Sequence, residues 1–86
     1  DIGQQASILS LLSAQWTTAN RYDDAVEACQ TALPMARQVG DRALEGRLLQ
    51  NLGAALWIRG DAERARQAAE AALAIRRDIK DQFGIA

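Results

Sequence analysis

The chain has 86 residues, of which 49 % are hydrophobic and 24 % charged, with 10 basic and 11 acidic side chains and a net charge of −1. This length allows one domain, and the composition is globular rather than disordered. The near-zero charge argues against direct binding of nucleic acid or an anionic membrane, and no apolar run approaches the about 20 residues of a membrane span.

One cysteine, Cys29, and the absence of histidine limit the chemistry of the chain. No internal disulfide is possible, which suits a reducing compartment, and we expect a cytoplasmic protein. The commonest general base and transition-metal ligand is missing. Asp23, Asp24 and Glu27 cluster at an expected helix start, where they complement the helix dipole without forming a calcium-loop pattern. We therefore expect no enzyme activity, no cofactor and no metal site.

The first two predicted elements are helices over residues 3–18 and 22–38, because apolar residues recur three or four positions apart in both segments. Asp1 and Gln4 have the spacing of a capping box at the start of the first helix. Asn20 lies between the two helices and tolerates the left-handed backbone conformation of a tight turn.

The next two predicted elements are helices over residues 42–58 and 62–79, with the same apolar spacing. Gly40 and Gly60 are placed as left-handed residues after a helix, and the aspartate that follows each can cap the next helix. Loops this short make consecutive helices antiparallel. Alternation with a period of two is absent, so the predicted fold class is all-α.

Pro34 lies inside the second predicted helix and removes the hydrogen bond to the carbonyl of Gln30. We expect this helix to bend or break near Gln30–Pro34.

The chain repeats itself with a period of 40 residues. Shifting the sequence by 40 makes ten of the 46 overlapping pairs identical, and most of them fall on apolar helix positions. Such a period indicates a helical array, with one repeat over about 1–40 and a second over about 41–80. Residues 81–86 would begin a third repeat and supply the first turn of a fifth helix. A chain starting at Asp1 is expected to be a piece of a longer protein.

The residues at the repeated positions resemble a pair of tetratricopeptide repeats. The second repeat reads Leu49-x2-Leu52-Gly53-x2-Leu56, then Ala65-x3-Ala69, then Ala72. The first reads Leu9-x2-Leu12-Ser13-x2-Trp16, then Ala25-x3-Cys29, then Ala32. The period of 40 in place of 34 is similar to the longer-helix branch of kinesin light chains and of bacterial signalling ATPases and transcriptional activators. The resemblance implies an α–α superhelix of two hairpins.

The resemblance also implies a concave groove, lined by the first helix of each repeat, that binds a peptide or a partner helix. The positions that correspond to it are Ser10, Thr17, Arg47, Gln50, Asn51, Ala54 and Trp57. Leu56-Trp57-Ile58 is wider than one apolar stripe, so one of the three should face a neighbour, a groove or a partner. Whether Trp57 belongs to the core or to the groove stays open.

Self-association is a further expectation, because arrays need about three or more repeats and capped ends. Ile75 and Ile79 on the last full helix, with Phe83 and Ile85 beyond it, should form an uncovered apolar surface. A twofold dimer is the commonest closed form that would cover such a surface.

The function expected from these features is non-catalytic protein–protein interaction or scaffolding, with a protein or peptide as partner. The alternative is a regulatory or sensor segment of a larger bacterial signalling ATPase or transcriptional activator. Nine arginines to one lysine suit a high-GC bacterial genome. A small hydrolase is disfavoured because histidine and nucleophile motifs are absent.

Overall fold

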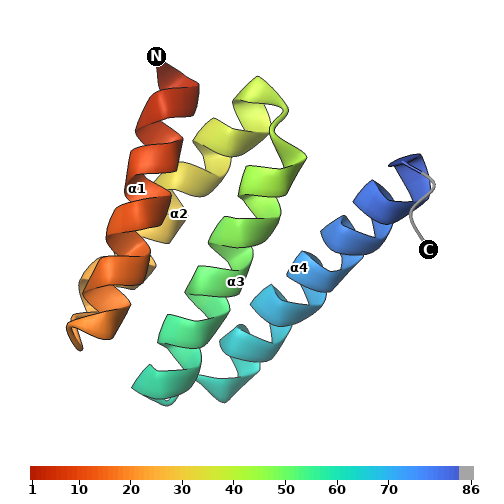
Figure 1. Cartoon of the computed structure of the whole chain (residues 1–86). Coiled ribbons are helices and arrows are strands. Elements are labelled where there is room, and N and C mark those ends of the chain that lie inside the picture. The colour runs from red at the N-terminus through yellow and green to blue at the C-terminus, as the bar shows by residue number, and fades with distance from the viewer. Residues whose placement is uncertain (84–86) are drawn as a thin grey trace.

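The computed structural model describes residues 1–83, with only the backbone described for Phe83. It contains four helices, α1 (Ile2–Thr18), α2 (Tyr22–Val39), α3 (Arg42–Arg59) and α4 (Ala62–Phe83), arranged as two antiparallel hairpins (Figure 1). The all-α prediction is confirmed. The helix boundaries follow the 40-residue period, because α1 and α3 begin 40 residues apart. None of these helices combines the length and apolarity needed to cross a membrane.

The three turns between helices share one hydrogen-bonded form. Each contains a residue with positive φ, namely Asn20 (65°), Gly40 (73°) and Gly60 (96°). In each turn an amide donates to the carbonyl five residues earlier: Arg21 to Trp16, Asp41 to Ala36 and Asp61 to Leu56. This pattern satisfies carbonyl groups that the helix end would leave without a partner, and it reverses the chain within a few residues.

Aspartates cap the helix starts as the sequence predicts. The Asp1 carboxylate accepts from the Gln4 amide at 2.8 Å, and the Gln4 side chain accepts in return from the amino group of Asp1. Asp41 caps α3 by accepting from the amide of Leu44 at 3.0 Å. The starts of α1 and α3 are therefore set by local chemistry that was visible in the sequence, whereas α2 begins after Arg21 without a side-chain cap.

The expected start of a fifth helix at Asp81 is wrong for residues 81–83, which extend α4. The reason lies at Lys80, which occupies the position that Gly40 holds one repeat earlier. Lysine is a good helix former and disfavours the left-handed conformation, so the helix continues. Ile85 and the other residues after Phe83 lie outside the described part of the chain.

Pro34 does not break α2, which is continuous from Tyr22 to Val39. The expected break is therefore wrong, whereas the expected bend stays a prediction. Pro34 is exposed on the surface of this helix.

The third helix is the centre of the molecule. It packs against α1, α2 and α4, whereas α4 packs only against α3 among the described residues (Figure 1). Gly46 and Gly53 permit the close approach of α4. A Cβ atom at Gly53 would lie 3.4 Å from the Ala65 carbonyl oxygen, and one at Gly46 would lie 3.3 Å from Ile75 Cγ2. One side of α4 is thus closely packed, and the other side has no helix against it.

Ion pairs hold α3 against α2 near both ends. The Glu45 carboxylate, only 9 % exposed, accepts from Arg37 Nε at 3.0 Å and also pairs with Arg42 at 3.4 Å. Near the other end, Arg59 Nη1 lies 2.8 Å from Asp23 Oδ1. The second pair is largely exposed and contributes little to stability.

Candidate interaction groove

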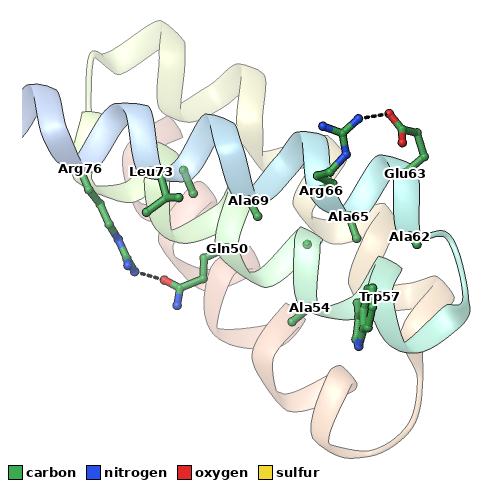
Figure 2. Close-up of a pocket in the computed structure, with 12 residues that line it drawn as sticks. Gln50, Ala54, Trp57, Ala62, Glu63, Ala65, Arg66, Ala69, Leu73 and Arg76 are labelled. Atoms are coloured by element: carbon green, nitrogen blue, oxygen red, sulfur yellow. Dashed lines mark hydrogen bonds and ion pairs between the residues drawn. The ribbon is translucent and has the colours of Figure 1, made fainter.

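A groove of about 620 Å³ runs between α3 and α4 (Figure 2). Its lining is supplied by four residues of α3 and eight of α4: Gln50, Gly53, Ala54, Trp57, Ala62, Glu63, Ala65, Arg66, Ala69, Ala72, Leu73 and Arg76. We call it the α3–α4 groove. Its α4 wall is a stripe of side chains spaced four, three, four and three residues apart, so it follows one face of that helix.

The centre of the α3–α4 groove is apolar and open. Trp57 is 68 % exposed and Leu73 50 % exposed, and Ala54 and Ala69 are exposed between them. Ala65 and Ala72 form part of the buried floor. The alanines keep the groove wide, and the two large side chains offer apolar surface that a partner could remove from water.

Two arginines lie on the α4 stripe, Arg66 near its start and Arg76 at its end. Arg66 pairs with Glu63 at 2.6 Å and with Glu70 at 2.9 Å, and hydrogen bonding by Glu63, followed by the charge of Glu70, raises the pKa of its guanidinium. At the opposite end, Arg76 donates to the side-chain oxygen of Gln50 (Figure 2). Arg66 is thus neutralised by two carboxylates, whereas Arg76 has a neutral partner and keeps a net positive charge.

Three of the residues expected in the partner groove lie together in the α3–α4 groove, namely Gln50, Ala54 and Trp57. The open question about Trp57 is answered by its exposure, since a core residue would be buried. Arg47 is exposed on α3 but is not part of the lining.

Of the other expected groove residues, Ser10 and Asn51 meet where α3 packs on α1. Asn51 is half-buried and donates through Nδ2 to the Ser10 carbonyl at 3.4 Å and to Ser13 Oγ at 3.2 Å. Thr17 is half-buried and donates to the Ser13 carbonyl at 2.8 Å. Ser10 is only 2 % exposed, so its expected place on a groove surface is wrong. The reason is that α3 covers this side of α1.

The residues expected to mediate self-association are mostly not on the surface. Ile75 is 5 % exposed and packs at Gly46, so its expected exposure is wrong. Ile79 is half-buried against the core. The side chain of Phe83 and all of Ile85 lie outside the described residues. Ile75 is buried because α4 places its side chain in the space that Gly46 leaves on α3.

The α4 wall of the groove, including Ala69, Leu73 and Arg76, was not predicted from the sequence. The signal that could have found it is the 40-residue repeat itself. The counterparts of these residues in the first repeat are Cys29, Leu33 and Ala36, three apolar residues on one helix face. A matching face in the last helix would have no following helix over it within residues 1–83.

Cys29 and the acidic side chains are the remaining groups that could act as a nucleophile or hold a metal ion. Cys29 is fully buried, and burial raises the pKa of its thiol, an effect that hydrogen bonding with Ser13 partly opposes. A buried thiol with a raised pKa is a poor nucleophile. Within residues 1–83, no group of three or more cysteine or acidic residues is placed to hold a metal ion.

Comparison with protein families agrees with the hairpin geometry. A family model described as tetratricopeptide repeat matches residues 4–78, which is most of the chain. The chain belongs to the tetratricopeptide repeat (TPR) family. Comparison with curated proteins and with solved structures gives no match. TPR domains generally bind proteins or peptides and are generally non-catalytic, so the chain is a protein-interaction module by family.

Proposed function

We propose that this TPR pair binds a partner peptide or helix in the α3–α4 groove. The observation that supports the proposal is the apolar centre of the groove, where Trp57 and Leu73 are exposed beside a row of alanines. Exposed apolar surface of this kind, bordered by polar residues, is typical of a protein-interaction site.

This proposal changes the expected partner surface in one respect. It keeps Gln50, Ala54 and Trp57 on the first helix of the second repeat, and it takes the opposite wall from α4 instead of α1. Asn51 is used within the domain to join α3 to α1, so it contributes to the scaffold that positions the groove.

The test is a selection of peptides of about 20 residues from a displayed library against the wild-type domain. Selected peptides should bind the wild type and should lose at least about tenfold in affinity for Leu73→Asp, because a carboxylate in the apolar centre must be desolvated on binding. Leu73 is half exposed, so this substitution should leave the fold intact.

The matched control is Ile8→Asp, which places the same charge on an equally exposed residue of α1, a helix that does not touch α4. Peptides that bind this control as well as they bind the wild type support the proposal. A selection that yields no binders, or binders indifferent to Leu73→Asp, would refute it.

The finer hypotheses stay predictions. They include the kinesin light chain-like branch, for which the 40-residue period is the support, and a regulatory role in a larger bacterial signalling ATPase or transcriptional activator. The dimer is also a prediction. Fewer residues support it, because Ile75 is buried and does not contribute to an exposed apolar surface.

A further inference from the structure

We propose that the α3–α4 groove takes an amphipathic helix of a partner protein in the pose that α3 takes on the first repeat, with an acidic residue in the first turn of that helix against Arg77. The inference rests on the proposed function, and it names the shape, direction and charge of the partner.

The first repeat contains the same face in a covered form. In α2, the residues Val26, Cys29, Leu33 and Ala36 are all buried, and α3 is the second helix that packs on α2. Their counterparts 40 residues later in α4 are Arg66, Ala69, Leu73 and Arg76, which are all exposed. The first α3 residue of the groove, Gln50, likewise corresponds to the buried Ser10. The α3–α4 groove is therefore the second-repeat copy of a surface that already holds a helix in this molecule.

The residues that α3 buries against the first repeat indicate which residues a helix in the α3–α4 groove needs. Leu44, Leu48 and Leu52 are at most 8 % exposed and recur every four residues on the side of α3 opposite Gly46 and Gly53. A helix in the groove would lie antiparallel to α4, as α3 lies antiparallel to α2. It would place a similar apolar row on Ala69 and Leu73.

The charges at one end of the groove indicate the direction in which the partner helix runs and the charge of its first turn. Glu45, in the first turn of α3, pairs with Arg37 at 3.0 Å. Arg77 is the counterpart of Arg37, and within residues 1–83 it has no acidic partner. Its neighbour Arg76 meets only the neutral Gln50. An acidic residue in the first turn of the incoming helix would neutralise this end, and it would also suit the dipole of that helix.

The same comparison disfavours a second copy of the chain as the occupant. The helix of a second copy that corresponds to α3 is α1, and the segment Ile2–Thr18 has no charged residue. It would present Gln5 to Arg77 where α3 presents Glu45, so the ion pair would be lost. Charge complementarity therefore favours a separate partner that carries the acid.

The probe is a synthetic peptide of residues 41–60 of this chain, which carries Leu44, Leu48 and Leu52 together with Glu45. The labelled peptide should bind the whole 86-residue chain with one-to-one saturation, measured by fluorescence anisotropy. Binding should weaken at least about tenfold for the protein variant Leu73→Asp and remain unchanged for Ile8→Asp.

A charge swap tests the direction of the helix. The peptide with Glu45→Arg should bind the wild type about five- to tenfold more weakly, because two guanidiniums would meet. The protein variant Arg77→Glu should restore that binding, and Arg77 is exposed, so the variant should fold. If Arg77 had only a structural role, the Arg77→Glu protein would not regain affinity for the Glu45→Arg peptide.

Three outcomes would overturn the inference. They are no binding of the peptide at millimolar concentration, binding that ignores the charge swap, and concentration-dependent self-association of the chain that Leu73→Asp abolishes. If library peptides bind the groove while the 41–60 peptide does not, the helix pose fails and the proposed function stands. If neither binds, both fail.

Discussion

At the scale of single residues, burial decides the chemistry of Cys29. Cys29 is 0 % exposed within a hydrophobic core to which all four helices contribute, so its thiol is shielded from water. The corresponding residue of the second repeat is Ala69, so the repeat has no thiol at this position in its second copy. Cys29 is therefore a packing residue.

The raised pKa of Cys29 makes stability depend on pH in the alkaline range. The unfolded chain releases the thiol proton near the ordinary value of 9.0, while the folded chain retains it, so the free energy of unfolding should fall as the pH rises above that value. Below it the contribution is constant. Urea titrations from about pH 8 to about pH 10 should show a shallower decline for Cys29→Ala than for the wild type. Equal slopes in the two proteins would contradict this account.

At the scale of helices and turns, local signals in the sequence were sufficient for most boundaries. Gly40 and Gly60 end helices with positive φ, and Asp1 and Asp41 begin them with side-chain caps. The end of α4 was mispredicted because the second repeat has Lys80 where the first has glycine. The end of a helix in one repeat predicts the end of its counterpart only where the residue that forms the turn is also repeated.

Pro34 offers a test of helix energetics. It lies on the exposed side of a continuous α2, and Ala74 occupies the same place in α4. Pro34→Ala should therefore raise the free energy of unfolding by about 1–3 kcal/mol, since alanine can restore the hydrogen bond to Gln30 and has a higher helix propensity. Chemical denaturation followed by circular dichroism measures the change.

The matched control is Ala74→Pro, which should lower the free energy of unfolding by about 3 kcal/mol. If Pro34→Ala leaves stability unchanged or lowers it, the proline is accommodated by a feature of α2 that stabilises the native state.

At the scale of the whole molecule, the sequence predicted three of the four groove residues that α3 supplies and none of those that α4 supplies. Gln50, Ala54 and Trp57 follow from the resemblance, because they lie on one face of a single helix. Ser10 was placed wrongly and the α4 wall was missed for the same reason, since helical periodicity does not say which face a neighbouring helix covers. That information comes only from the packing of α3 on the first repeat.

The central claim is that the α3–α4 groove is the binding surface of this TPR pair. The most direct measurement is a two-dimensional nitrogen–proton NMR titration with a library-selected peptide, because the two tryptophan indoles report on separate places. Trp57 is in the groove, whereas Trp16 is half-buried in the first hairpin, with the Arg21 guanidinium 5.7 Å from its ring centroid. The account predicts shifts of the Trp57 indole and of the amides of Ala69, Leu73 and Arg76, with the Trp16 indole unchanged. Shifts confined to α1 and the Trp16 indole would contradict it.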